Sequence, residues 1–597
     1  MKKIFLCIIT LTILLISCKQ DKKETVTAPV LKNTSFNKLL KEYNEGKFKL
    51  NPINATFAGD NRFNDQFPNT LSEAYSEKYN AFFNNFKAKL TNFKDADLSE
   101  SEQMSKAVLD WDCDMALAQN SFKNDVLMPI NQMWTINLTM GTFASGSGAQ
   151  PFKTVKDYQN WLSRLNGYAT WLETAIKNMR IGIKNDFVLP KSLIKKVIPQ
   201  FKSLAESKTK THLFYTPITN LPTNFTDVDK KMLTEAYTKI LDNKLIPVFN
   251  TMYTFLKTDY LKAGRNSSGI DAVPNGKAYY KHAIKNYTTT KMTADEIHQL
   301  GLKEVARILS EMEKVKEQVG FKGSLKAFFN DVRENKKLMP YTTPKQIIDN
   351  FNAIHTKMKP QLEKLFGNKP KTQFIVKQTE KFREASASAE YNAGSLDGTR
   401  PGVFYTPIPD ATKYNVFMDE ALFLHEAIPG HHYQISLTQE NKELPDFRKT
   451  LWYSAYGEGW ALYTENLGKE LGLYTDPYQY FGMLGMEIHR AIRLVVDTGI
   501  HTKGWSREKA IQYSLDNEAE SEASIISEIE RYMANPGQAL SYKIGQLKIR
   551  ELRAKAKKEL STKFDIREFH NQVLETGCIP LALLESKIDI WIASNKN

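Results

Sequence analysis

Three of the ten histidines of this chain lie within eight residues, in the segment His-Glu-Ala-Ile-Pro-Gly-His-His at positions 425–432. A glutamate, Glu426, directly follows the first of them. The run before it, from Val416 to Leu424, is largely apolar, which predicts a buried helix. Buried polar groups are costly unless they have partners. A zinc ion bound by these side chains would account for their placement.

The spacing of the histidines departs from the common zinc motif HExxH, in which two histidines lie one helical turn apart and the glutamate is a general base. Here Pro429 occupies the position of the second histidine. On a straight helix His431 points away from His425, and His432 lies roughly 10.5 Å further along the axis. That is too far for two ligands of one zinc ion, each about 2.0–2.1 Å from the metal.

The Pro-Gly pair can resolve this difficulty. Proline clashes with the carbonyl four residues earlier in a helix, and glycine permits unusual dihedral angles. We therefore expect a kink or bulge at Pro429 and Gly430. Looping out two residues would bring His431 to the second ligand position. The alternative is a helix end with capping or core histidines.

The motif HExxPGHH, followed by Glu-Gly-Trp-Ala-Leu-Tyr at positions 458–463, resembles the signature of the bacterial family called domain of unknown function 885. That family is similar to zincin metallopeptidases of the thimet oligopeptidase and thermostable carboxypeptidase groups. The resemblance covers most of the chain and is densest from Tyr391 to Tyr542. It implies a large, mainly α, gluzincin-type metallopeptidase body with a short β element beside the active-site helix. Which of His431 and His432 binds the metal stays open.

The resemblance also implies a third ligand, a carboxylate about thirty residues after the first histidine. Glu458 stands 33 residues after His425, or 31 if the two-residue insertion is discounted. Glycines on both sides of Glu458 allow a neighbouring helix to approach closely. Glu465 lies on the same helix face and is either an alternative ligand or a residue that orients one.

Two later segments carry further candidates. Charged groups lie inside an apolar helix from Arg490 to His501. In it, Asp497 is predicted to orient a ligand histidine and His501 to contact substrate or assist proton transfer, or both belong to a buried polar network. Arg531 and Tyr532 are predicted to bind substrate. The segment around Tyr542 resembles the tyrosine-bearing segment of thimet-type peptidases, where a phenol stabilises the oxyanion.

A short strand is predicted at 402–406 because the segment is β-branched and aromatic between two prolines. In zincins an edge strand beside the active helix pairs with the substrate backbone. Arg400, just before this strand, meets a substrate carboxylate or serves the structure.

The N-terminus predicts export. Two lysines precede an apolar run that is too short to span a membrane, and the run ends in Leu-Ile-Ser-Cys, which resembles the lipobox of bacterial lipoproteins. We expect a signal peptide at 1–17, lipidation of Cys18, and a polar tether at 18–34. The protein would then be anchored through its lipid in the cell envelope, facing the periplasm or the outside.

The remaining chain, 35–597, predicts one large, mostly helical domain, with two lobes around a cleft as an option. Helices are expected at Ala294–Gln318 and Pro344–Leu365, among others. The chain is 42% hydrophobic and 25% charged, which excludes a disordered protein. Its net charge of +14 comes from scattered lysines. The densest basic stretch, 543–563, has helical apolar spacing and predicts a solvated helix face, so nucleic acid is not an expected partner. Whether Cys113 and Cys578 pair stays open.

These observations predict a zinc-dependent hydrolase, a metallopeptidase that acts as a monomer on short peptides at the envelope. His425, His431 and Glu458 would hold Zn²⁺, Glu426 would be the general base, and Tyr542 or His501 would donate to the oxyanion. One alternative is an amidase acting on a non-peptide envelope substrate. The other is a catalytically silent binding lipoprotein, against which the presence of Glu426 argues, because a structural zinc site needs no base.

Overall fold

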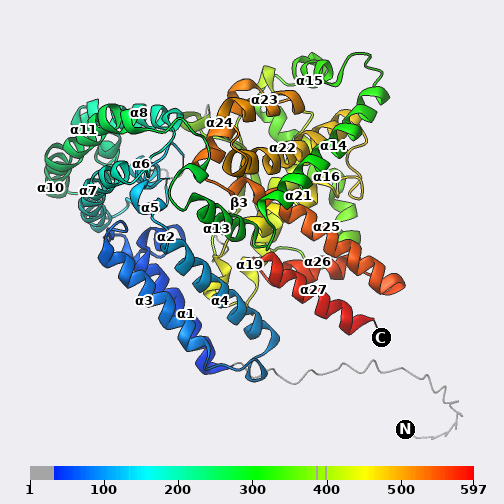
Figure 1. Cartoon of the computed structure of the whole chain (residues 1–597), viewed down its shortest axis with the longest axis horizontal. Helices are drawn as coiled ribbons and strands as arrows, with labels where there is room; N and C mark the ends of the chain where they lie inside the picture. The colour runs from blue at the N-terminus through cyan, green and yellow to red at the C-terminus, as the bar shows by residue number, and fades with distance from the viewer. Residues whose placement is uncertain are drawn as a thin grey trace, which may run out of the picture.

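The computed structural model describes residues 33–133, 135–146, 148–384, 387–396, 398 and 400–596. The predicted signal peptide, Cys18 and most of the predicted tether lie outside these residues. The described chain is mainly helical, as predicted, with one small sheet (Figure 1). No helix within the described ranges is both long and apolar enough to cross a membrane.

The first part of the chain is helical throughout. Its helices are α1 (Thr34–Leu50), α2 (Pro52–Phe57), α3 (Glu73–Leu90), α4 (Glu100–Asn120), α5 (Asn124–Leu127), α6 (Ile136–Ala144), α7 (Val155–Lys184), α8 (Lys191–Glu206), α9 (Thr216–Thr219), α10 (Asp227–Ile240), α11 (Ile246–Phe255) and α12 (Leu261–Ala263). Reciprocal capping boxes begin α4 and α7, at Ser99 with Glu102 and at Thr154 with Asp157. Each box satisfies backbone N–H groups that the first turn leaves without partners.

The second part holds the predicted site. Its helices are α13 (Gly276–Thr288), α14 (Ala294–Gln318), α15 (Leu325–Glu334), α16 (Pro344–Leu365), α17 (Lys381–Glu384), α18 (Asp419–Glu426), α19 (His431–Glu440), α20 (Asp446–Lys449), α21 (Ser454–Glu465), α22 (Pro477–Thr502), α23 (Arg507–Asn517), α24 (Glu522–Ala534), α25 (Ser541–Leu560), α26 (Ile566–Leu574) and α27 (Leu581–Asn595). The bounds predicted for α14 and α16 are confirmed.

The sheet has three strands, β1 (Phe374–Gln378), β2 (Glu390–Asn392) and β3 (Gly402–Thr406), in the order β1-β3-β2. The strand predicted at 402–406 is confirmed as the central one. It runs parallel to β1, with Val376 opposite Phe404, and antiparallel to β2, with Tyr391 opposite Phe404. Both outer strands are short, which leaves little unpaired edge.

Two apolar clusters form the interior. The smaller one is built from residues between Ile53 and Tyr260, and its helices α7, α8, α10 and α11 gather on one side of the molecule (Figure 1). The larger one joins α1, α3 and α4 to the elements after residue 270. α4 contacts α13 and α27, so the two ends of the described chain share one core. Cys113 and Cys578 are both buried and are not joined by a disulfide.

The basic stretch predicted as a solvated helix face lies on α25. Its apolar positions are buried as predicted: Ile549, Leu552, Ala556 and Leu560. Lys543 differs, because it is fully buried, with its Nζ 2.6 Å from Glu487 Oε1 and 3.0 Å from Glu304 Oε2. A buried charge needs such partners, and this one connects α25 to α22 and α14.

Candidate metal centre

The helix carrying the first histidine breaks where Pro429 and Gly430 predicted it. α18 ends at Glu426 and α19 begins at His431, and the Ile428–Pro429 bond is cis. The indole Nε1 of Trp460 donates to the Pro429 carbonyl at 2.8 Å, which holds the break against α21. A side chain at Gly430 would collide with the His425 carbonyl, so glycine permits the tight return of the chain.

The break brings His431 beside His425. Together with Glu458 they form a three-residue cluster whose ligand atoms all lie within 4.8 Å of one another. Glu458 Oε2 is 3.6 Å from His425 Nε2 and 3.4 Å from His431 Nε2. His425 and His431 are buried, and the Glu458 side chain is 16% exposed. The three side chains come from α18, α19 and α21, and all converge on one point.

These donors suit zinc. Two imidazole nitrogens and one carboxylate oxygen are a ligand set of catalytic zinc sites, which keep a fourth position open. Ligand atoms about 2.0–2.1 Å from a tetrahedral ion lie about 3.4 Å apart. The two separations from Glu458 Oε2 are close to this value. If the ligand nitrogens of His425 and His431 come within the same distance of each other, all three ligand atoms can bind one ion.

Glu465 fixes the orientation of His425. Its Oε1 lies 2.7 Å from His425 Nδ1, which directs Nε2 toward Glu458. Of the two alternatives for Glu465, the structure places it behind the ligand rather than in the cluster. Such carboxylate–histidine pairs are typical partners of metal ligands. Burial alone would lower the pKa of His425, but Glu458 and Glu465 raise it to about 9. A bound cation would displace that proton.

His432 faces away from the cluster, toward the sheet. Its Nδ1 is 3.0 Å from the Tyr391 hydroxyl and 3.3 Å from Ser436 Oγ, and its ring packs against Phe374. Burial lowers the pKa of His432 to about 4. The neutral ring therefore positions α19 on the sheet.

Glu426 lies next to the cluster and is 7% exposed. Burial raises the pKa of its carboxyl, while the charges of His425, His431 and Arg490 oppose that rise. Arg490 stands on α22, which packs on α18.

Asp497 and His501 belong to a different network, which corrects the roles predicted for them. Asp497 accepts hydrogen bonds from the Tyr280 hydroxyl at 2.5 Å and the Gly537 N–H at 3.1 Å, not from a ligand histidine. His501 uses both ring nitrogens on backbone groups, the Ile270 N–H at 3.0 Å and the Tyr532 carbonyl at 3.1 Å. Both side chains are fully buried. They tie α13, α22 and α24 together, the buried polar network given above as the alternative.

A second residue of α22, Arg493, lies next to Tyr542 and to the predicted substrate residue Tyr532. The other predicted substrate residue, Arg531, also lies beside Tyr542. The Arg493 guanidinium lies 4.6 Å from the centre of the Tyr542 ring, and Arg531 Nη2 is 3.5 Å from its hydroxyl. Tyr532 is 2% exposed and donates its hydroxyl to Glu528, the carboxylate to which Arg493 and Arg531 also donate.

Ser541, the residue before Tyr542, connects the start of α25 to the start of α21. Ser541 Oγ lies 2.7 Å from the Oγ of Ser454, which is the first residue of α21 and stands one turn before Glu458. Close packing of α21 on α25 requires glycines at the crossing, since a side chain at Gly545 would collide with the Ala455 carbonyl.

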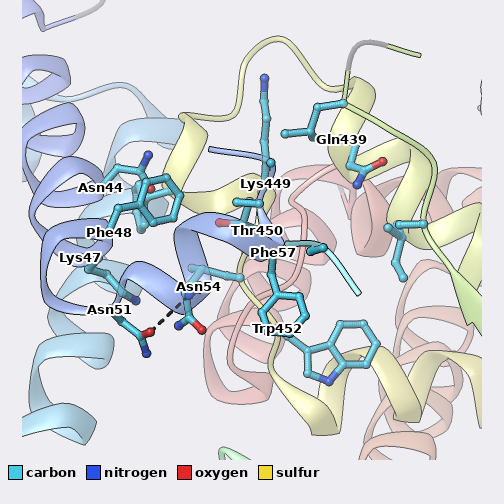
Figure 2. A pocket seen from close by; sticks show the side chains of 18 of the residues that line it. Asn44, Lys47, Phe48, Asn51, Asn54, Phe57, Gln439, Lys449, Thr450 and Trp452 are labelled. Carbon is cyan, nitrogen blue, oxygen red and sulfur yellow. Dashed lines mark hydrogen bonds between the residues drawn. The ribbon is translucent and has the colours of Figure 1, made fainter. Parts of the chain in front are cut away.

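A cavity of about 1320 Å³ opens beside the cluster, between the first helices and the segment from α19 to Trp452. Figure 2 shows Asn44 and Phe48 on one side, and Phe57 beside Trp452 on the other. Its lining is rich in amide and aromatic side chains. One of its lining residues, Trp452, also packs against the cluster, with its ring 5.8 Å from that of His431.

Arg400 also lines this cavity, at the exposed approach to β3. Its Nη1 donates to the Ala393 carbonyl at 3.0 Å and its N–H to Ser395 Oγ at 2.9 Å. These bonds hold the turn between β2 and β3, which is the structural role given above.

Three residues near these groups had no role predicted from the sequence: Trp452, Arg490 and Arg493. Trp452 carries no spacing signal. The two arginines do, because they are charges inside the apolar sequence of α22.

The family described as bacterial protein of unknown function (DUF885) matches residues 52–588. A structure described as a candidate lipoprotein from Colwellia psychrerythraea has 28% sequence identity, a TM-score of 0.84, and coverage of 94% of this chain and 99% of its own. Another, described as a candidate lipoprotein of unknown function from Shewanella oneidensis, has 18% identity, a TM-score of 0.70, and coverage of 93% and 99%. The second likeness concerns the fold alone. A comparison with curated proteins finds no match.

Proposed function

We propose that this chain, which belongs to the bacterial family DUF885, is a zinc-dependent peptidase that cleaves short peptides at the cell envelope. The observation that carries the proposal is the convergence of His425, His431 and Glu458 within 4.8 Å, with Glu426 beside them. A metal site that served structure alone would need no buried glutamate next to its ligands. The zincin-type character of the body is part of this proposal.

His425, His431 and Glu458 would hold the ion, and Glu465 keeps His425 in the orientation that binding requires. When bound, zinc supplies Lewis acidity toward a substrate carbonyl and lowers the pKa of water. Proton transfer and stabilisation of the oxyanion are assigned to side chains of the protein.

Glu426 is assigned as the general base. It takes a proton from the attacking water and delivers it to the leaving amine, a role that typically contributes 10²–10⁴-fold to the rate. Tyr542 is assigned as the donor to the developing oxyanion. It is half-buried and lies at the start of α25, next to the residue that contacts α21.

The cavity supports a peptide substrate. Its volume of about 1320 Å³ exceeds the ~300–1,000 Å³ of most small-molecule sites. Amide side chains such as Asn44, Asn54 and Gln434 can exchange hydrogen bonds with a peptide backbone, and the lining residue Trp452 packs against His431.

We place the protein in the envelope as a lipoprotein acylated at Cys18. The lipobox supports this location, and the structures described above as candidate lipoproteins agree with it. Monomeric action is part of the same proposal.

Metal analysis combined with cleavage of a peptide library tests the function. We expect about one zinc per chain in the wild type, and much less in His425→Ala. Glu426→Gln keeps the three ligands, so it should retain zinc and lose about 10²–10⁴-fold in activity. His355→Ala, a half-buried histidine on α16 outside the cluster, is the matched control and should retain both.

A folded wild type that stays metal-free after zinc is supplied would refute the metal. Glu426→Gln within a few-fold of wild-type activity would remove Glu426 from its role. Zinc binding without cleavage of any library peptide would refute the peptidase and favour an envelope amidase or a silent binding protein.

A further inference from the structure

Three arginines stand on two helices that pack together: Arg490 and Arg493 on α22, and Arg531 on α24. Arg493 is bonded to two residues of α24. Its Nε donates to the Tyr532 hydroxyl at 3.0 Å and its Nη2 to Glu528 Oε2 at 2.9 Å. Arg531 Nη1 donates to the other oxygen of the same glutamate at 3.1 Å. Both oxygens of Glu528 are therefore engaged by arginines.

The positive charge of this group exceeds the negative charge. Glu528 is the one carboxylate that Arg493 and Arg531 share. Glu518 lies nearby but pairs with His489, 2.5 Å from its Nδ1. No described carboxylate lies within ion-pair distance of Arg490, whose Nη1 donates only to the Met486 carbonyl at 3.3 Å. Arg493 and Arg531 thus share Glu528 with the Tyr532 hydroxyl and with His489, whose Nε2 lies 3.6 Å from Glu528 Oε2.

Two buried donors of these arginines find no acceptor among the described residues. Arg493 is 4% exposed, yet its Nη1 has no hydrogen-bond partner there. The buried Nε of Arg490 has none either. Leaving a buried donor of a charged group without a hydrogen bond costs free energy. Their presence one helical turn apart on α22 indicates a place built for an acceptor that the chain itself does not supply.

The position of the group connects it to the reaction. Arg490 stands on α22, which packs on α18, the helix that ends in Glu426. Arg493 lies against the ring of Tyr542, which we assign as the oxyanion donor. The cavity is lined by Trp452, on the α20–α21 connection, whose ring lies 5.8 Å from that of His431.

We propose that Arg490, Arg493 and Arg531 bind a carboxylate of the substrate close to the bond that is cleaved. Guanidinium groups match a carboxylate in geometry and give charge-assisted hydrogen bonds. The carboxylate is either the free C-terminus of the peptide or an acidic side chain. This inference rests on the proposed peptidase function and adds its substrate class.

Binding to the Glu426→Gln protein tests the proposal without relying on turnover. Three short peptides of one sequence differ only in their carboxylates. The first has an amidated C-terminus and no acidic side chain, the second a free C-terminus, and the third an amidated C-terminus with one glutamate. We expect the second or the third to bind at least about tenfold tighter than the first by calorimetry. Whichever binds tighter identifies the source of the carboxylate.

The preference should fall to within about twofold when Arg490→Gln is added. Arg490 has no ion pair, so this variant should fold. Arg493→Lys, which keeps the charge but loses the planar fork, should reduce the preference in part. Arg567→Gln is the matched control, because Arg567 is exposed and pairs with Asp565 in its own helix turn. It should keep the full preference.

Equal binding of all three peptides would overturn the carboxylate site, and so would a preference that survives both Arg490→Gln and Arg493→Lys. The proposed function fails differently. A wild type that shows the carboxylate preference but neither binds zinc nor cleaves peptides would refute the peptidase and leave the arginine site standing. An active enzyme without the preference would refute the arginine site alone.

Discussion

The adjacent residues His431 and His432 point in different directions and make different contacts. His431 directs Nε2 toward Glu458 at 3.4 Å. His432, the next residue, points about a third of a helical turn away and contacts Tyr391 and Phe374 of the sheet. Only His431 shares a carboxylate with His425. The choice between the two histidines therefore follows from the direction in which α19 leaves the break.

Replacing each of these histidines in turn should separate a residue that binds zinc from one that stabilises the fold. We expect His431→Ala to lose most of its zinc, because two protein ligands do not readily hold the ion in a catalytic site. His432→Ala should keep most of its zinc and lose stability, on the order of 1 kcal/mol, because the Tyr391 hydroxyl loses a buried partner. Zinc content after identical dialysis and thermal unfolding measure the two effects. If His431→Ala retains zinc and His432→Ala loses it, the metal ligand is His432.

At the scale of elements, helices that meet at the site are joined by buried polar groups. Thr464 of α21 donates to the Leu424 carbonyl of α18 at 2.9 Å, next to the bond between Glu465 and His425. Behind the site, Lys543 of α25 lies between Glu487 of α22 and Glu304 of α14. These contacts fix the helices on which the ligands and the arginines stand.

The Lys543→Met variant should unfold more easily. Removing one member of a buried ion pair leaves uncompensated charge and typically costs about 3–5 kcal/mol. The free energy of unfolding in denaturant measures the loss. Lys558→Met, at an exposed position of the same helix, should change it by no more than about 0.5 kcal/mol.

The loss should also depend on pH. Burial alone would raise the pKa of Glu304, but Arg307 and Lys543 lower it from 4.5 to about 2. A carboxyl whose pKa is lower in the folded state stabilises the protein above its unfolded value and loses that effect as the pH falls. The difference between wild type and Lys543→Met should therefore shrink between pH 4.5 and 2. A difference that stays constant over this range would show that the lost charge pairing is not its cause.

At the scale of the whole molecule, the candidate metal centre belongs to the larger core, and the cavity beside it is lined by residues far apart in the chain. Asn44 and Phe57 come from α1 and α2, whereas Gln434 and Trp452 follow the histidine segment. The first helices therefore line this cavity, although they carry none of the proposed ligands. They also lie just after the predicted tether, which would hold the cavity near the membrane.

The Cys18→Ser variant tests that anchoring. Cys18 lies outside the described residues, and its lipidation rests on the lipobox. We expect the variant to incorporate no labelled fatty acid and to leave the membrane fraction, because the thiol that is acylated is gone. Cys113→Ser, at a buried cysteine, is the matched control and should stay in the membrane fraction. Fatty acid that still enters Cys18→Ser would refute the assignment.

Local sequence by itself determined several features. The bounds of α14 and α16, the strand at 402–406 and the break at Pro429 and Gly430 all depend on propensity, periodicity and steric restriction between near neighbours. The His-Glu segment and Glu458 were also visible in the sequence, through residue type and through the family resemblance. Such signals need no knowledge of which distant elements touch.

The tertiary structure decided the rest. It placed Glu465 on His425 Nδ1, turned His432 to the sheet, and buried Lys543 within a stretch that helical spacing alone indicated as solvated. It also drew Asp497 and His501 into backbone contacts, and joined Arg531 to Arg493 of α22 through Glu528. Each of these outcomes depends on the packing of helices that are distant in the chain, because a buried polar side chain takes the partner that packing brings within hydrogen-bond distance.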